Sequence, residues 1–276
     1  MDRAGQCRQL AEDGYTRLPN ILSPEMLEQA RRVSDELLAG QDEEHFDRQR
    51  STGSMIGVQA HPWFAELVAW PPALQALKDL GFAETRFTSG YVISKPPHSP
   101  PLFWHQDWAG WDDPGSYTEP TLQVFLMYYL VDTTPENGCL RVLRGSHRHR
   151  HAMHDLVSVA HTEVLHRATD PSHPAFQPIE EDIAVPVAAG DLVVGDARLL
   201  HGAYANNSDH RRTVLTLWFH RWDRYSEPLK AHMTGTQSTV GQWPADAQAR
   251  IKSLIPDYAG DAEPIAWNRV PGPDFR

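Results

Sequence analysis

Apolar residues in the first eighty positions recur at helical spacing. Ser23 and Pro24 form a helix start, with a capping hydroxyl and a proline at the first helical position, and Gly40 is a plausible end. Between them the apolar positions recur every three or four residues: Met26, Leu27, Ala30, Val33, Leu37 and Leu38. A second such segment, residues 62–80, is interrupted by two prolines. The pattern predicts a helical scaffold over about residues 1–82.

From about residue 86 the pattern changes to short β-type runs separated by Pro, Gly, Asn and Asp. The expected strands are residues 87–94, 122–131, 140–143, 183–187, 191–194 and 213–222. No helix-length segment alternates with them, which disfavours a parallel sheet and favours an antiparallel sandwich or barrel. We therefore expect one domain over residues 1–276. It is mainly β with flanking helices, and its core spans about residues 86–222.

Two segments depart from this pattern. About residues 147–182 are polar and hold seven of the fifteen histidines: His147, His149, His151, His154, His161, His166 and His173. A loop this long is usually functional or mobile, and His-rich tracts can bind zinc. Because no clear carboxylate or thiol arrangement accompanies them, we interpret the segment as a solvated insertion or lid. Residues 223–276 are Pro-rich with scattered aromatics, and we expect this extension to cap the core or meet a second subunit.

Composition then narrows the class of function. The chain has 25 Lys and Arg against 36 Asp and Glu, a net charge of −11, and this acidic balance argues against a nucleic-acid partner. The longest apolar run is only strand-sized, so no segment is expected to span a membrane. Two cysteines and the lack of an apolar leader point to a reducing setting. We expect a cytoplasmic monomer or homodimer that acts on a small molecule.

The most informative segment is residues 104–108, Trp-His-Gln-Asp-Trp. Alternate side chains of an extended strand share a face, so His105 and Asp107 should project together while Gln106 points away. An imidazole, a carboxylate and one further histidine make the 2-His-1-carboxylate facial triad, which leaves three positions on an octahedral Fe(II) open. The H-x-D triplet alone is weak evidence, because such triplets are common by chance.

Candidates for the rest of such a site lie downstream. His201 follows a turn and an apolar strand and precedes Gly202, which places it at a strand end. Arg212 comes eleven residues later, after a turn-like Asn-Asn-Ser-Asp, so a hairpin would return it beside His201. Arginine can hold a carboxylate through two parallel hydrogen bonds. A metal site with an adjacent arginine therefore suggests a dicarboxylate co-substrate.

The chain carries several motifs in a fixed order. They are Asp13-Gly14-Tyr15, then Ile93-Ser94-Lys95-Pro96-Pro97 before the H-x-D segment, then the run Glu136 to His147, and finally Ala189-Gly190-Asp191 before His201-Gly202 and Arg212. From roughly residue 14 to residue 222 this arrangement resembles the phytanoyl-CoA dioxygenase family of Fe(II)- and 2-oxoglutarate-dependent oxygenases. Several motifs in the right order and spacing are far more specific than any one of them.

The resemblance implies a double-stranded β-helix core, the cupin-like jelly roll, with helices packed outside it. His105, Asp107 and His201 would bind iron, and Arg212 would hold the far carboxylate of 2-oxoglutarate. Arg211 is the rival for that role, because the two arginines are adjacent and point to opposite faces. The cofactors implied are Fe(II), 2-oxoglutarate as co-substrate, and O₂.

Five further side chains are weaker candidates. Gln123 and Tyr91, on strands near the motif, could contact the co-substrate. Trp111, Trp108 and Arg144 could contact the substrate. Each has an ordinary alternative, since indoles also pack in β-sandwich cores and a surface arginine is usually solvated or ion-paired.

The activity implied is hydroxylation, desaturation or ring formation at a C–H bond, with release of succinate and CO₂. Asp107 disfavours halogenation, because related halogenases carry a small residue there. No extension for coenzyme A is evident, which favours a small natural-product or amino-acid-like substrate. The main alternative is a cupin-type metal-binding protein or isomerase without oxygenase activity, which would not need Arg212. A zinc hydrolase is disfavoured because H-E-x-x-H is absent.

Overall fold

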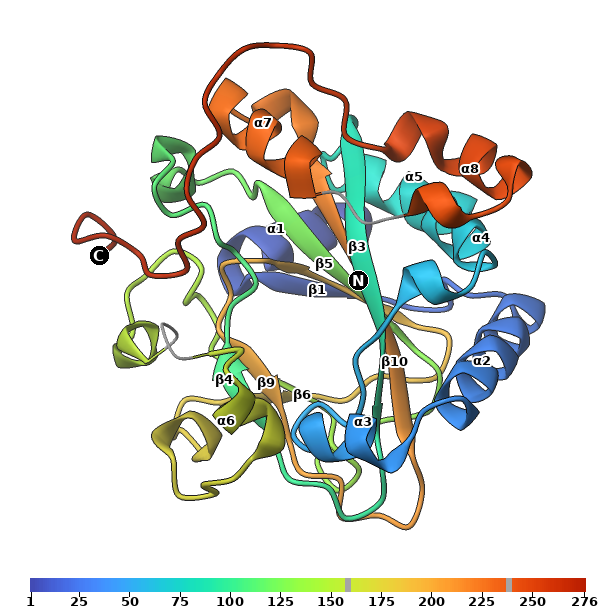
Figure 1. The fold of residues 1–276 in the computed structure, drawn as a ribbon. Coiled ribbons are helices and arrows are strands. Elements are labelled where there is room, and N and C mark those ends of the chain that lie inside the picture. Colours follow the sequence, from blue (N-terminus) through green and yellow to red (C-terminus); the bar gives the residue numbers. More distant parts are fainter. Residues whose placement is uncertain (157–159, 237–239) are drawn as a thin grey trace.

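Two antiparallel sheets form the core of the computed structural model, which describes residues 1–156, 160–236 and 240–276 (Figure 1). The larger sheet has the strand order β1 (Tyr15–Leu18), β8 (Leu192–Asp196), β5 (Gln123–Tyr129), β10 (Arg212–Arg221), β3 (Thr85–Lys95) and β2 (Ile56–Gly57). The smaller sheet has the order β4 (Leu102–His105), β9 (His201–Ala203), β6 (Leu140–Val142) and β7 (Ile183–Val185). This arrangement is consistent with a jelly roll.

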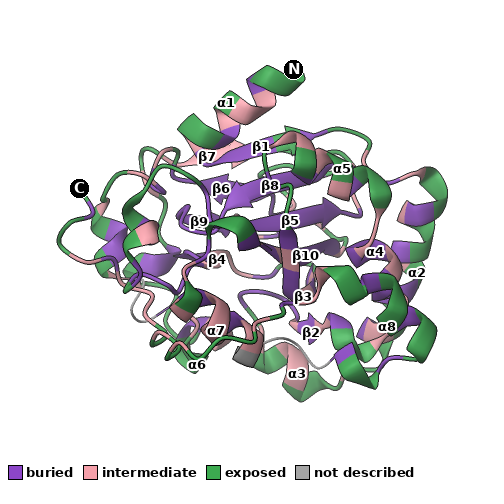
Figure 2. Cartoon of the chain, turned by 90° about the horizontal axis from the view of Figure 1, so that it is seen from above, coloured by how far each residue is buried: buried purple, intermediate pink, exposed green. Residues whose placement is uncertain are grey.

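Strand β5 shows how the two faces of the larger sheet divide. Phe125 and Met127 belong to an apolar cluster between the sheets, together with Val142 of the smaller sheet. The alternate residues Val124 and Leu126 pack instead against the outer helices. Both faces are covered, so every residue of β5 is buried, and the central strands are the most continuously buried part of the chain in Figure 2.

Helices cover the outer face of the larger sheet (Figure 1): α2 (Pro24–Ala39), α4 (Phe64–Val68), α5 (Pro71–Asp79) and α8 (Ala245–Ile251). The start of α2 is as the sequence predicts, because Ser23 Oγ accepts a hydrogen bond from the Met26 amide at 3.2 Å. Helix α1 (Arg3–Asp13) lies beside the edge strand β1. No helix among the described residues is long and apolar enough to cross a bilayer.

Two expectations about secondary structure are wrong in part. The first eighty residues also contain β1 and β2, which are too short for periodicity to detect and are held by pairing with distant strands. More of the described residues lie in helices than in strands, so "mainly β" applies to the core only. The remaining helices are α3 (Glu43–Arg48), α6 (Glu163–Arg167) and α7 (Glu227–Thr236).

The polar insertion is packed against the smaller sheet. Met153, Leu165 and Phe176 from the insertion form a cluster with Phe103 and Trp104 of β4. His147 and His154 are 1% and 0% exposed. The interpretation of this segment as a solvated loop is therefore wrong for these residues, because apolar side chains between the histidines anchor it. The two strands expected to begin at residues 183 and 191 begin at Ile183 (β7) and Leu192 (β8).

The C-terminal extension folds back over residues 108–111, directly after the H-x-D triplet. Leu229 and Phe275 pack with Trp108 and Trp111 in one apolar cluster. The backbone of Asn268 forms a parallel bridge with Gly110. The extension therefore caps one end of the core, which was the first of the two roles expected for it.

Candidate metal centre and active site

Two histidines from neighbouring strands face one another. His105 at the end of β4 pairs in register with His201 at the start of β9, and their ring centroids are 4.2 Å apart. His105 Nδ1 lies 3.0 Å from the Phe103 carbonyl, and His201 Nδ1 lies 2.9 Å from the Leu199 carbonyl. A backbone acceptor on Nδ1 fixes the ring and leaves Nε2 free as a lone-pair donor.

The Asp107 carboxylate faces the Nε2 atoms of both rings. Its Oδ1 is 3.7 Å from His105 Nε2, and its Oδ2 is 3.8 Å from His201 Nε2. The chain leaves β4 after His105, and the Asp107 amide donates to the Ala197 carbonyl at 2.8 Å. Trp218 Nε1 donates to Asp107 Oδ2 at 2.8 Å and orients the carboxylate. The predicted meeting of His105 and Asp107 is therefore present, although Asp107 lies just beyond the strand.

The electrostatics of this cluster suit a divalent cation. Burial and the neighbouring His201 ring lower the pKa of His105 to about 3, against the opposing effect of Asp107. Neutral imidazole is the form that binds a metal. Two ligands bound at about 2.1 Å to one ion are at most about 4.2 Å apart, so the 3.7 and 3.8 Å separations fit shared coordination.

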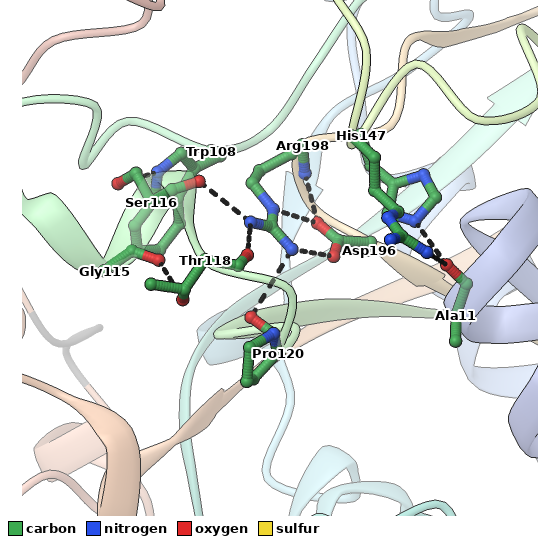
Figure 3. Close-up of polar contacts among 10 residues, drawn as sticks. Ala11, Trp108, Gly115, Ser116, Thr118, Pro120, His147, Asp196 and Arg198 are labelled. Carbon is green, nitrogen blue, oxygen red and sulfur yellow. Dashed lines mark hydrogen bonds and ion pairs between the residues drawn. The ribbon is translucent and has the colours of Figure 1, made fainter. Parts of the chain in front are cut away.

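A buried ion pair fixes the turn that leads into β9 (Figure 3). Arg198 Nη2 lies 2.7 Å from Asp196 Oδ2, and the two side chains are 3% and 1% exposed. Arg198 also donates to the Ser116 carbonyl at 2.8 Å, while Ser116 Oγ accepts from Trp108 Nε1 at 2.9 Å. The pair therefore ties the segment after the H-x-D triplet to the turn that carries the second histidine.

Arg212 is a buried cation at the start of β10. It is 4% exposed, and its Nε has no hydrogen-bond partner among the described residues. Lys95 lies opposite it in register and donates to the carbonyls of Ser51, at 2.7 Å, and Pro100. Arg211 points elsewhere: it is partly exposed and donates to the Ser94 carbonyl at 3.0 Å. Of the two rival arginines, only Arg212 is buried with free donor capacity.

A cavity of about 330 Å³ opens beside Asp107. Tyr91 and Gln123 line it, as the sequence predicts for residues close to the site. Tyr91 packs edge-to-face on Trp218, with ring centroids 5.7 Å apart. The cavity walls also include Arg269 from the C-terminal extension.

Three predicted substrate residues lie outside this cavity. Trp108 and Trp111 are each 1% exposed and pack in the cluster beneath the C-terminal extension. Arg144 has 58% of its side chain exposed and lies 3.7 Å from Asp13. The structure therefore gives these side chains the packing and ion-pair roles that were their ordinary alternatives.

Residues 10–214 match the family described as phytanoyl-CoA dioxygenase (PhyH). The chain belongs to this family. The match includes both histidines, Asp107 and Arg212, and it ends within β10, before Trp218 and Arg269.

Relatives and structural neighbours of this phytanoyl-CoA dioxygenase family member are described with the same co-substrate. A probable alpha-ketoglutarate-dependent hypophosphite dioxygenase of Stutzerimonas stutzeri is 25% identical, and the alignment covers 78% of each chain. The carbocyclase SnoK of nogalamycin biosynthesis, described as non-heme and alpha-ketoglutarate-dependent, is 26% identical with a TM-score of 0.58, over 78% of this chain and 83% of that one. HygX of Streptomyces hygroscopicus, with nickel and 2-oxoglutarate bound, is 18% identical with a TM-score of 0.60, over 78% and 86%. 2-Oxoglutarate, also called alpha-ketoglutarate, is thus named for all three of these proteins, and a bound metal, nickel, is named for HygX.

Sequence reasoning missed three side chains at the site of this family member. Trp218 bonds Asp107, Arg269 lines the cavity, and a ring nitrogen of His161 comes within 4.8 Å of the donors of both His105 and Asp107. Trp218 could have been found, since alternation along the strand puts it on the same face as Arg212. The other two arrive from segments distant in sequence, for which no local pattern gives a signal.

Proposed function

We propose that this chain is an Fe(II)- and 2-oxoglutarate-dependent oxygenase whose iron is held by His105, Asp107 and His201. The observation that carries the proposal is the convergence of two Nε2 atoms on the two oxygens of one buried carboxylate, at 3.7 and 3.8 Å. Three protein ligands on one face leave three positions for co-substrate and O₂. When bound, iron and 2-oxoglutarate would activate O₂, and the resulting oxidant would break a C–H bond of the substrate.

Arg212 is proposed to bind the far carboxylate of 2-oxoglutarate. Burial lowers the pKa of Arg212, and only Tyr129 and Cys139 act against this, so no carboxylate of the described chain balances its charge. A buried cation without a partner is costly, and a bound dianion would remove that cost. Thr216 Oγ1, buried on the same face of β10 without a partner, is a further candidate contact, and Gln123 and Tyr91 are others.

The protein's own residues prepare this site for a metal. The carbonyls of Phe103 and Leu199 hold both imidazoles with Nε2 toward the carboxylate. Trp218 donates to Asp107 and so limits its rotation. Phe125, packed against the His201 ring at 4.7 Å between centroids, keeps water from the inner side.

The cavity bears on the substrate class. Tyr91, Trp218 and Trp267 provide aromatic walls, while Arg269 provides a cation. This combination suits a small natural-product or amino-acid-like molecule that carries both an apolar part and a polar or anionic group. We propose hydroxylation, desaturation or cyclisation of such a molecule. The hypophosphite dioxygenase among the relatives makes a small oxyanion the second candidate, which Arg269 also suits.

Succinate release tests this proposal. The protein is supplied with Fe(II), 2-oxoglutarate and air, and screened against amino acids, aromatic natural products and hypophosphite. Substrate-dependent succinate is expected in the wild type and not in Asp107→Ala. A protein that binds metal but neither binds 2-oxoglutarate nor forms succinate would instead be a cupin-type binding protein or isomerase.

A further inference from the structure

His161 belongs to the insertion, yet its ring lies at the metal centre. A ring nitrogen of His161 lies within 4.8 Å of ligand atoms of both His105 and Asp107. The His161 and His105 rings meet edge-to-face, with centroids 5.1 Å apart and planes at 89°. Two ligands across one ion span about 4.2 Å, and the 4.8 Å limit on the separations of His161 from the other two residues is close to that span.

The polar contacts of His161 resemble those of the two proposed ligands. The Gln106 backbone carbonyl lies beside its ring, while its Nε2 is buried and has no partner among the described residues. His105 and His201 show the same division, with one ring nitrogen on a backbone carbonyl and the other facing the carboxylate. A buried ring nitrogen without a protein partner needs an explanation, and a bound metal ion is one that the neighbouring ligand atoms support here.

The backbone conformation of His161 also indicates a functional position. His161 has φ +63°, in the left-handed region that residues other than glycine rarely adopt. Such a conformation costs about 1–3 kcal/mol and persists only where surrounding contacts hold it, often at functional sites. Phe103 packs edge-on against the ring at 5.6 Å between centroids, and His166 lies tilted beside it at 5.9 Å, so that the two side chains hold the ring near His105.

We propose that His161 is a fourth protein ligand of the metal before the co-substrate binds. This rests on the proposed function, because it takes the site of His105, Asp107 and His201 as the iron site. Four protein ligands plus two oxygens from 2-oxoglutarate would fill all six positions of the metal. In that arrangement His161 would have to leave the metal before O₂ could bind, so the insertion that carries His161 would control when the site can react.

The experiment uses the full chain loaded with Co(II), which keeps the metal stable in air. Each coordinated histidine gives one hyperfine-shifted exchangeable N–H resonance in the proton NMR spectrum. The wild type is expected to show three such signals without 2-oxoglutarate, and two would overturn the proposal. This count needs no variant, so it stands even if a substitution disturbs folding.

Variants supply the second measurement, the dissociation constant for Ni(II) of the metal-free protein. His161→Ala is expected to lose one shifted signal and to bind Ni(II) about 10-fold or more weakly, a loss at least as large as that for residues that only support metal ligands. His149→Ala, an exposed histidine of the same insertion, should match the wild type. Unchanged Ni(II) binding and spectra in His161→Ala would overturn the proposal. If His105→Ala also binds metal normally, the iron site itself is wrong.

Discussion

Gln106 and Arg269 bind each other reciprocally across 163 positions of sequence. Gln106 Nε2 donates to the Arg269 carbonyl at 2.7 Å, and Arg269 Nη1 donates to the carbonyls of Gln106 and Asp107 at 3.0 and 3.1 Å. The residue between the two proposed ligands therefore points away from the metal because it anchors the C-terminal extension. The extension in turn holds the backbone of the ligand segment.

Arg269 is expected to position the metal ligands. In Arg269→Ala both carbonyls lose a charged donor, and such bonds are worth about 1.5–3 kcal/mol. The ligand segment loosens, and Ni(II) affinity should fall about 10-fold, as for other residues that support metal ligands. Calorimetric titration of the metal-free protein measures this. Arg144→Ala, which removes an exposed arginine, serves as the control, and equal affinities in the two variants would contradict the role of Arg269.

Arg212 and Arg211 offer a matched pair for the co-substrate. Arg212→Ala should weaken 2-oxoglutarate binding by about 2–5 kcal/mol, roughly 30-fold or more, because a buried charge pair loses one partner. Arg211→Ala removes only a partly exposed contact to a backbone carbonyl and should change the affinity less than about 2-fold. Titration of the Ni(II)-loaded protein gives both constants. Comparable losses in the two variants would exclude Arg212 as the specific carboxylate contact.

The Asp196–Arg198 pair should matter for folding as well as for the site. Arg198→Met leaves a buried carboxylate without its partner, which typically costs about 3–5 kcal/mol. The free energy of unfolding from urea denaturation measures this loss. Arg250→Ala breaks an exposed pair with Glu66 and should cost less than about 1 kcal/mol. A small effect of Arg198→Met would show that the network in Figure 3 does not hold the turn.

Acid should destabilise the metal-free protein through buried neutral histidines. Burial lowers the pKa of His154 to about 4 and that of His220 to about 3. Above pH 6.5 these groups are neutral in both folded and unfolded chains. Between pH 6.5 and these values only the unfolded chain binds protons, so stability falls with falling pH, by about 1.4 kcal/mol per unit for each group.

Denaturation at several pH values tests this. His154→Phe should have a pH slope shallower than the wild type by about 1.4 kcal/mol per unit between pH 6 and 5, whatever its absolute stability. His149→Ala, an exposed histidine nearby, is expected to keep the wild-type slope. An unchanged slope in His154→Phe would mean that His154 takes up its proton in the folded state at an ordinary pH.

The sequence predicts the core of this protein well because the core follows local rules. The cap at Ser23, the alternation along β5 and the strand β10 all result from spacing and turn residues near each position. The order of the motifs, through the resemblance to the family, points to the proposed ligands and to Arg212. Inward direction at Gln123 also follows from alternation once the neighbouring Phe125 is known to be inside.

The remaining features depend on contacts between distant segments. Trp111 is a plausible cavity residue from its place near the H-x-D triplet, but the docking of the C-terminal extension buries it. His161 looks like one of seven similar histidines until the packing of the insertion on Phe103 places it. No periodicity along the chain encodes either contact.

The most direct measurement of the central claim is an anaerobic titration with Fe(II) and 2-oxoglutarate, followed by visible absorption. If His105, Asp107 and His201 hold iron with room for a chelating co-substrate, the wild type should develop a metal-to-ligand charge-transfer band that saturates at one equivalent. Asp107→Ala should show none, and Arg144→Ala should match the wild type. No band in the wild type, or a full band in Asp107→Ala, would contradict the account.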